Sequence, residues 1–532
     1  MRKNLFWTLT ALAACLGGAA LAGAATLEVP ATYSTIQAAI DAAADGDEIL
    51  VAPGTYTETL DIFDLSDLTL RGSGGAASTT IDADSTGSAI EISASPGTTI
   101  EGFTVTGGSA SGGAGIAIES SSSTTVRACI VSGNVAAGVG EGGGLRVEGS
   151  DDVEIADSVI DGNTAEVGGG VYATGSTLDI ENSEITGNTA SGDGGGLYVD
   201  GLFTFGTELS GSTIGGNSAA NGGGAYSDGG GLRLLDTTVT GNSATTQGGG
   251  LYLTGGLFTE VTGGSVSGND ADEGGGAYVG SVTVQVLLRS CLVTDNLASG
   301  GRGGGLLLED LFAAGSSRVI IDGCTFANNE AEEGGALYVL DSTVSAGNSI
   351  FWSDTADFGP EMVVEGDTED AEVVVEVSNL IESNVLELGT GELDYGAGNL
   401  DEDPLFVDEA GGDYHLTATS PCIDAGAVGL LTPDEDYEMD TRNTDGDGDG
   451  AAFPDMGADE VCPFLPGDAD ASGTVSIVDG LNVLDYLFNG GPAPSPVLAV
   501  ADVNGDGSVS IADAQRILAY LFSSGPRLIC RP

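Results

Sequence analysis

Two twelve-residue segments near the C-terminus carry oxygen-bearing side chains at nearly every second position. In the first, positions 1, 3, 5, 7, 9 and 12 are Asp468, Asp470, Ser472, Thr474, Ser476 and Asp479. In the second, which begins 34 residues later, they are Asp502, Asn504, Asp506, Ser508, Ser510 and Asp513. Hard oxygen donors at this spacing wrap one Ca²⁺, with glycine at position 6 and a backbone carbonyl donated from position 7. Gly473 and Gly507 occupy position 6, so we predict two calcium sites rather than acidic turns that bind nothing.

Each segment runs into a short stretch with the apolar spacing of an amphipathic helix. The apolar residues are Leu481, Leu484, Leu487 and Phe488 after the first segment, and Ala514, Ile517, Leu518, Leu521 and Phe522 after the second. Residues 484–488 (LDYLF) and 518–522 (LAYLF) echo each other, which indicates a tandem duplication. We expect the two apolar faces to pack on one another. Because so small a core is marginal, metal binding should supply much of the folding free energy.

This loop–helix pair resembles a type I dockerin over about residues 467–526. The resemblance implies that the loops bind calcium and that the helices dock on a cohesin-like partner. Loop positions 10 and 11, which often steer partner choice in that family, are apolar here: Ile477, Val478, Ile511 and Ala512.

Other residues with chemical potential give weaker signals. Asp445, Asp447 and Asp449 alternate with glycine but lack a ligand at position 12, so a calcium site and a solvated turn both stay open. His415 is the only histidine and sits in an alternating stretch, where we expect a structural role. Lys3 is the only lysine.

The elements that carry these residues follow an internal repeat. Glycine clusters begin at Gly142, Gly168, Gly194, Gly222, Gly248, Gly274, Gly303 and Gly334. An asparagine precedes each cluster, at Asn134, Asn163, Asn188, Asn217, Asn242, Asn269, Asn296 and Asn328. Short alternating β-branched runs lie between them, as in residues 178–181. Such units close the coils of a solenoid. We predict eleven or so coils, with the asparagines forming an inward ladder.

The units resemble the repeats of right-handed parallel β-helix proteins, including polymorphic outer membrane proteins, over about residues 100–350. Residues 35–43, with Ile36, Ala39, Ile40 and Ala43 on one helical face, resemble the capping entry segment of pectin-lyase-like β-helices. The predicted fold is therefore mainly β: a right-handed parallel β-helix with a short N-terminal capping helix and a small α-helical tandem calcium-loop domain.

A recurring tyrosine marks one face of the coils. Tyr172, Tyr198, Tyr226, Tyr252, Tyr278 and Tyr338 each lie four residues after the first glycine of a cluster. Strand alternation turns them outward, where stacked coils would align them. Two interpretations stay open: a platform for sugar rings or a partner protein, and an aromatic ladder that only stabilises stacking.

Cysteine spacing leaves pairing open. Cys291 and Cys324 fall in adjacent coils, where they form either a disulfide or two buried free thiols. Cys129 lies several coils away, too far to bond with either. Among Cys422, Cys462 and Cys530, we expect a pair between Cys422 and Cys462.

The N-terminus and the net charge indicate an exported protein. Residues 1–25 have the basic start, apolar stretch and small residues of a signal peptide. Residues 12–15 also resemble a lipobox that would anchor Cys15, a reading we favour less because the following residues stay apolar. No later segment is long and apolar enough to span a membrane. A net charge of −67 disfavours nucleic acid and anionic membranes as partners.

Residues 348–461 break the repeat and resemble a choice-of-anchor Q domain in segments such as 403–408, 420–426 and 455–460. The predicted domains are a signal peptide (1–25), a β-helix (26–347), this end region (348–461) and a dockerin-like calcium-binding domain (462–532).

These features predict a secreted or cell-surface protein that is non-catalytic, displays a binding or adhesion surface and is tethered through calcium. Polysaccharide is one candidate ligand. The alternative is an extracellular polysaccharide lyase or glycoside hydrolase. It would require a groove with an arginine such as Arg127, Arg146, Arg233 or Arg289 beside carboxylates. The β-helix lyases use such a base, whereas the Gly-His-Gly motif of polygalacturonase-like hydrolases is missing from the sequence.

Overall fold

The computed structural model describes residues 24–530 except 202–205, 256–257, 281–284, 310, 312–317, 368–370, 430–433, 447–450, 496–497 and 523–527. The predicted signal peptide, apart from its last two residues, therefore lies outside the described residues, as do Cys15, Asp447 and Asp449. Export and calcium binding by the third acidic cluster stay predictions.

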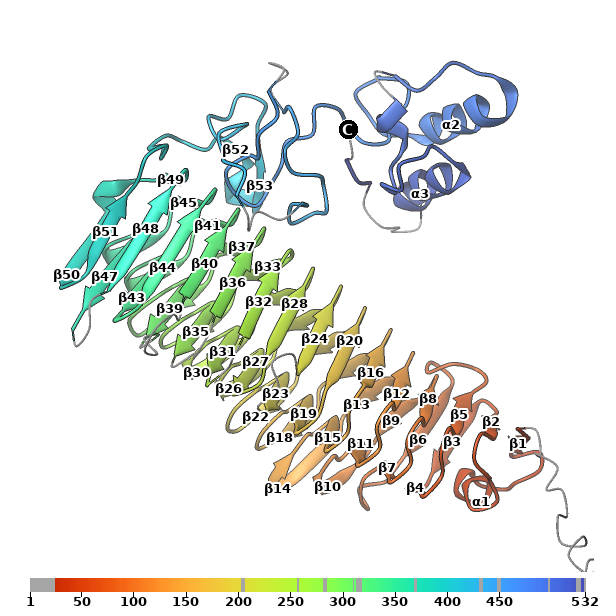
Figure 1. The fold of residues 1–532 in the computed structure, drawn as a ribbon. Coiled ribbons are helices and arrows are strands. Elements are labelled where there is room, and N and C mark those ends of the chain that lie inside the picture. Colours follow the sequence, from red (N-terminus) through yellow and green to blue (C-terminus); the bar gives the residue numbers. More distant parts are fainter. Residues whose placement is uncertain are drawn as a thin grey trace, which may run out of the picture.

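The body of the chain is a parallel β-solenoid built from four sheets (Figure 1). Sheet A has fifteen strands, from β1 (Thr26–Val29) to β51 (Glu392–Tyr395). Sheets B and C have thirteen strands each, from β3 (Gly54–Thr57) to β49 (Asn379–Leu380) and from β4 (Leu60–Phe63) to β50 (Val385–Gly389). Sheet D has ten strands, from β10 (Ser109–Gly112) to β46 (Thr355–Phe358). The predicted fold class is confirmed, with about thirteen coils instead of eleven. At about 4.8 Å per coil the rod is roughly 60 Å long.

One coil shows how the repeat folds. It consists of β19 (Val171–Thr174), β20 (Leu178–Glu181), β21 (Glu184–Thr186) and β22 (Thr189–Ala190). Alternation buries Leu178 and Ile180 and exposes the acidic residues between them. The next coil stacks in register, with Leu178 opposite Thr207.

The glycine clusters mark where coils approach most closely. A Cβ on Gly170 would lie 2.6 Å from the Gly196 carbonyl oxygen and 2.9 Å from Asn188 Nδ2. Gly168, at the start of the cluster, has a φ of +63°, which side chains rarely adopt. Close contact between coils therefore requires glycine at position 170, and the backbone conformation favours it at position 168.

The buried asparagines form the predicted inward ladder. Asn163 Nδ2 donates to Asn188 Oδ1 at 3.0 Å and to the Val131 carbonyl at 2.9 Å, and the Asn163 backbone N–H donates to the same Asn188 oxygen at 3.0 Å. One member was wrongly predicted. Asn329 takes the ladder position, because Asn328 adopts a φ of +58° and turns its amide to the Tyr414 hydroxyl at 3.0 Å.

Asp354 takes the next ladder position, where the preceding coils have asparagine. Asn329 donates to Asp354 Oδ1 from its backbone N–H at 2.8 Å and from Nδ2 at 2.7 Å. Asp354 Oδ2 and Glu361 Oε2 are both buried without a hydrogen-bond partner among the described residues. Burial, with the charge of Glu361 beside it, raises the pKa of Asp354, and burial raises the pKa of Glu361 to about 7.

We expect Asp354→Asn to stabilise the coils in a pH-dependent way. In the fold the Glu361 carboxyl keeps its proton up to about pH 7, and burial raises the pKa of Asp354 as well. The unfolded chain loses both protons near pH 4, so native stability falls as the pH rises above that value. The amide should raise the free energy of unfolding by about 1–3 kcal/mol at alkaline pH and by much less at acidic pH. Denaturant unfolding of the coils across this range checks the prediction, and an equal effect at both ends would contradict it.

The coils continue past residue 347, although the repeating glycine clusters and asparagines stop there. Strand β47 (Met362–Gly366) buries three successive apolar residues, and β48 (Glu372–Glu376) buries alternating ones and pairs in parallel with β51. At the other end, α1 (Ile36–Ile40) adds Ile36, Ala39 and Ile40 to the core of the coils, as the predicted capping helix should.

We call residues 396–461 the flanking segment, and its described residues pack along the side of the coils (Figure 1). Its strands β52 (Phe406–Asp408) and β53 (Asp413–Leu416) form an antiparallel pair. Buried Arg442 donates from Nη2 to the carbonyls of Gly323 (3.2 Å) and Gly457 (2.7 Å). The choice-of-anchor Q resemblance of this region stays a prediction.

Candidate functional site

The first acidic loop gathers its carboxylates around one point. Oxygen atoms of Asp468, Asp470 and Asp479 lie within 4.8 Å of one another. Asp468 and Asp479 are nearly inaccessible, at 5% and 0% exposure. Backbone N–H groups hold both: Gly473 donates to Asp468 Oδ2 at 2.7 Å, and Ser476 donates to Asp479 Oδ2 at 2.8 Å. The loop therefore fixes three acids that only a cation or protons can neutralise.

The second loop repeats this geometry. Gly507 N–H donates to Asp502 Oδ2 at 2.8 Å and Ser510 N–H donates to Asp513 Oδ2 at 2.8 Å. Asn504 stands where the first loop has Asp470, and Asp506 stands where it has Ser472, so each loop has three carboxylates. Gly473 and Gly507 both have a φ of +83°, as the sharp turn at position 6 requires.

The donor set of both loops suits Ca²⁺. Hydrogen bonds from Ser472 and Ser508 lower the pKa values of Asp470 and Asp506, so these carboxyl groups are anionic at neutral pH. The Ser472 hydroxyl also contacts the Thr474 carbonyl oxygen at 3.2 Å, which places the predicted position-7 donor at the loop interior. Ser476 and Ser510 donate their hydroxyls to the position-12 carboxylates, at 3.0 and 3.1 Å, and thereby orient them.

Two helices depend on these loops. Helix α2 (Ile477–Asn489) starts with a capping box between Ser476 and Asp479, so one carboxylate both faces the loop and caps the helix. Helix α3 (Ile511–Phe522) packs against it: a Cβ on Gly480 of α2 would lie 3.4 Å from the Leu518 side chain. Val483, Ala514 and Ile517 are buried in their shared core. Losing a loop should therefore loosen the helix that follows it.

Much of the apolar surface of these helices stays outside that core. Exposed fractions are 49% for Ile477, 54% for Leu481, 68% for Phe488, 51% for Ile511 and 69% for Phe522. The expectation that Leu481, Phe488 and Phe522 pack between the helices is therefore wrong. We call Ile477, Leu481, Phe488, Ile511 and Phe522 the apolar helix surface.

A disulfide joins the ends of this module, and it is not the predicted pair. Cys462 bonds Cys530, with Cα atoms 6.1 Å apart, whereas Cys422 is a buried free thiol that accepts from Asn379 Nδ2 at 3.3 Å. The Cys530 backbone N–H donates to Asp440 Oδ1 at 2.6 Å, which ties the module to the flanking segment.

The other cysteines lie inside the coils. Cys291 and Cys324 are buried free thiols in adjacent coils, with sulfur atoms 3.5 Å apart. Cys129 is also buried and free.

The six recurring tyrosines, from Tyr172 to Tyr338, lie on sheet C, and we call them the tyrosine stripe. Its first five rings stack face to face, with centroids 4.7–5.1 Å apart and planes within 16°. Leu307 separates Tyr278 from Tyr338, which is 2% exposed and has the Arg302 guanidinium 5.1 Å from its ring centroid. Because neighbours cover the ring faces, the stripe presents edges and hydroxyl groups. Its role as a ligand surface stays a prediction.

The four arginines singled out from the sequence are ion-paired, and one of them lines a hollow. Arg233 contacts Glu208 (Nη1 to Oε2, 2.5 Å) and Glu260 (Nε to Oε2, 3.1 Å) on sheet A. A shallow depression of about 220 Å³ is lined by Asp152, Thr177, Asp179, Gly206, Thr207, Glu208 and Arg233. Burial, then the charge of Glu208, raises the pKa of Asp179. Outside this depression, Arg127 pairs with Glu101, Arg289 pairs with Glu260, and Arg146 pairs with three glutamates.

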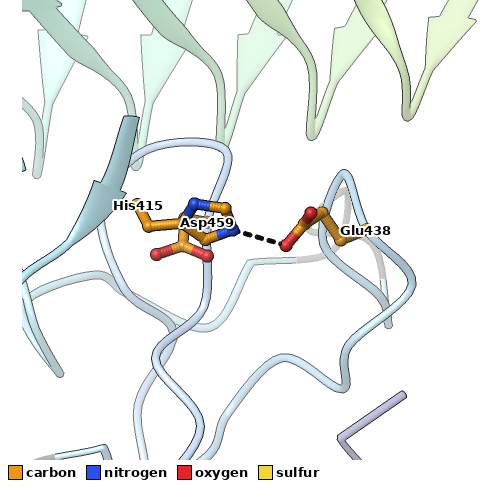
Figure 2. Close-up of side chains that lie close together, drawn as sticks. All are labelled: His415, Glu438 and Asp459. Carbon is orange, nitrogen blue, oxygen red and sulfur yellow. Dashed lines mark hydrogen bonds and ion pairs between the residues drawn. The ribbon is translucent and has the colours of Figure 1, made fainter. Parts of the chain in front are cut away.

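His415 lies beside Glu438 and Asp459, two acids that are distant from it in the sequence (Figure 2). Its Nδ1 is 2.5 Å from Asp413 Oδ1 and its Nε2 is 2.7 Å from Glu438 Oε2. The hydrogen bond to Glu438 raises the pKa of His415 to about 10. Sequence reasoning missed Glu438 and Asp459, because both come from irregular segments with no recognisable spacing.

Comparison with known proteins identifies two parts of the chain. The model of the right handed beta helix region matches residues 68–205 and 195–356, together more than half of the chain, and that of the dockerin type I domain matches residues 466–522. No curated protein sequence matches significantly. Across the described residues, no helix combines the length and apolar character needed to cross a membrane.

Several solved structures are similar in fold at low sequence identity. Pectate lyase Pel9A matches with a TM-score of 0.36 and 12% identity, covering 83% of this chain and 98% of that one. The catalytic unit of a GH87 α-1,3-glucanase from Streptomyces thermodiastaticus strain HF3-3 matches with a TM-score of 0.37 and 15% identity, covering 69% and 65%. The PL6 family alginate lyase AlyGC matches with a TM-score of 0.34 and 10% identity, covering 72% and 54%.

Proposed function

Because the chain belongs to the right-handed β-helix family and ends in a dockerin type I domain, we propose that it is a tethered extracellular display protein. The dockerin domain binds two Ca²⁺ ions and docks on a cohesin-like partner. The coils then hold a long, strongly acidic surface in place for contact with other molecules, polysaccharide among them. Secretion or cell-surface location forms part of this proposal.

The apolar helix surface carries the proposal. A protein with a net charge of −67 rarely leaves several large apolar side chains exposed on one small module. Ile477 and Ile511 begin their helices, and the other three residues lie further along them, so the positions of all five depend on the calcium loops that start the helices. Calcium would thus control docking by building the surface that docks, rather than by bridging to the partner.

The coils favour display over catalysis. The arginines Arg127, Arg146, Arg233 and Arg289 all form ion pairs with glutamates. Such pairs favour the charged guanidinium and work against its use as a general base. The calcium of the loops is expected to serve structure, because the loop oxygens are engaged with the backbone of the same loop.

Exchange of Phe488 and Phe522 for serine tests the docking role. Both side chains lie outside the calcium loops, so the variant should keep its helices and its calcium. We expect affinity for immobilised type I cohesins in Ca²⁺ to fall about 30-fold or more, as for the loss of interface aromatic anchors. Val139→Ser, at an 82% exposed apolar position on the coils, is the matched control. Unchanged binding of the double variant would contradict the proposal.

A second candidate function is polysaccharide cleavage at the Arg233 depression. It is favoured by the raised pKa of Asp179, an acid in the same hollow that Arg233 lines. The screen is release of unsaturated or reducing ends from acidic glycans. Activity lost in Arg233→Ala and kept in Arg127→Ala would support the enzyme, whereas inert wild-type protein would leave the display function.

A further inference from the structure

The only histidine of the chain is built into a polar cluster outside the calcium loops. Figure 2 shows the His415 ring directed at the Glu438 carboxylate, with Asp459 beside it. One ligand atom from each of these three residues lies within 4.8 Å of the others. The Tyr437 hydroxyl is also 3.2 Å from Nε2. One nitrogen and two carboxylate oxygens thus converge at one point.

The back of the imidazole is held by a separate carboxylate. Asp413 lies two residues away on the same strand, β53, with Oδ1 at 2.5 Å from Nδ1. A carboxylate on Nδ1 fixes the ring orientation and leaves Nε2 as the outward-facing donor. Metal-binding histidines characteristically have this support behind them.

The supporting segments are fixed to one another and to the coils. The Asp459 side chain accepts the Leu416 backbone N–H at 2.9 Å, and the Tyr437 N–H donates to the Ala458 carbonyl at 3.1 Å. Ala458 N–H in turn donates to Thr325 Oγ1 on the coils at 2.9 Å. Asp459 is 5% exposed, while the His415 side chain is 37% exposed. The cluster is therefore preorganised at its base and open to solvent at its ring.

We propose that His415, Glu438 and Asp459 bind a divalent transition-metal ion, with Zn²⁺ as the first to test. Calcium takes oxygen ligands, so an imidazole nitrogen directs the site away from the ion of the loops. Zinc accepts nitrogen and carboxylate oxygen together, and three protein ligands leave a further position for water. On binding, the metal takes the place of the Nε2 proton, which passes to solvent. Asp413 acts as a positioning residue.

The site would brace the segment that joins the coils to the dockerin domain. β53, the loop around Glu438 and the segment around Asp459 all belong to the flanking segment. Cys462, the first cysteine of the disulfide, follows Asp459 by three residues. A metal at this point would cross-link three stretches just before the chain enters the module.

A single histidine gives a single-residue probe of the proposal. Full-length protein without a histidine tag, labelled with ¹⁵N only at histidine and kept in excess Ca²⁺, is titrated with Zn²⁺. We expect the original His415 resonances to be replaced at one equivalent by a new set, with Nε2 shifted toward the metal-bound position and Nδ1 still protonated. Resonances that stay in place through several equivalents would overturn the proposal and leave a histidine–carboxylate ion pair.

Variants separate this site from the rest of the acidic surface. Glu438→Gln and Asp459→Asn should each weaken zinc binding at least tenfold, and Asp413→Asn about 10- to 100-fold. Asp401→Asn, an exposed acid of the same segment, is the matched control and should bind as the wild type does. If a ligand variant fails to fold, Asp413→Asn still decides, because it keeps all three ligands. Equal zinc affinity in Asp413→Asn, Glu438→Gln and the control would contradict the assignment.

Discussion

In a chain carrying Asp479→Ala and Asp513→Ala, we expect calcium binding at both loops to be lost and helices α2 and α3 to stop forming. Each carboxylate is fully buried, closes its loop at position 12 and accepts the N–H at position 9. Its removal takes away a charged ligand and a helix cap together. We expect affinity at the altered loop to fall about 100-fold or more, since calcium affinity follows ligand charge and rigidity.

Calorimetry with the single and double variants measures this effect. Each single variant should bind one ion in place of two, and the double variant none. Thr474→Ala is the matched control, because position 7 donates through its backbone carbonyl and the Thr474 side chain is exposed. Two tight sites persisting in the double variant would show that the ions bind elsewhere on the acidic surface.

The second large effect is expected at the asparagine ladder. Asn217 Nδ2 donates to the Ile185 carbonyl and to Asn242 Oδ1, at 2.9 and 3.0 Å. Its Oδ1 accepts the backbone N–H and the Nδ2 of Asn188, at 2.9 and 3.1 Å. Asn217→Ala would leave these buried groups without hydrogen-bond partners and would open a cavity. The free energy of unfolding of the coils should therefore fall by about 3–5 kcal/mol.

Chemical denaturation followed by far-UV circular dichroism measures the Asn217→Ala effect. Thr189→Ala, an exposed neighbour in the adjacent coil, should change stability by no more than about 0.5 kcal/mol. Similar losses in the two variants would mean that the ladder adds little beyond the stacking of the strands.

The coils could be predicted from sequence because their constraints recur. Glycine is required where coils touch backbone to backbone, and asparagine where a buried turn needs both a donor and an acceptor. The ladder position in residues 328 and 329 was ambiguous, because two adjacent asparagines compete and only the backbone conformation separates them. Coils beyond residue 347 also bury apolar residues but lack the repeating glycine clusters and asparagines, so the predicted number of coils was too low.

The calcium loops were equally accessible to prediction, since all their ligands lie within twelve consecutive residues. The His415 cluster was not, because its members come from residues 413–459 and meet only through the packing of irregular segments. With 80 acidic residues in the chain, spacing cannot select Glu438 and Asp459. The Cys462–Cys530 pair was missed for a similar reason: it closes a module whose ends meet only after folding.

Hydrogen–deuterium exchange on the full chain, with calcium and after chelation, tests most directly whether calcium builds the docking module. We predict that residues 477–489 and 511–522 are protected in calcium and exchange rapidly after chelation, while the strands of the coils exchange equally slowly in both. Helices that are equally protected without calcium, or unprotected in its presence, would contradict the account.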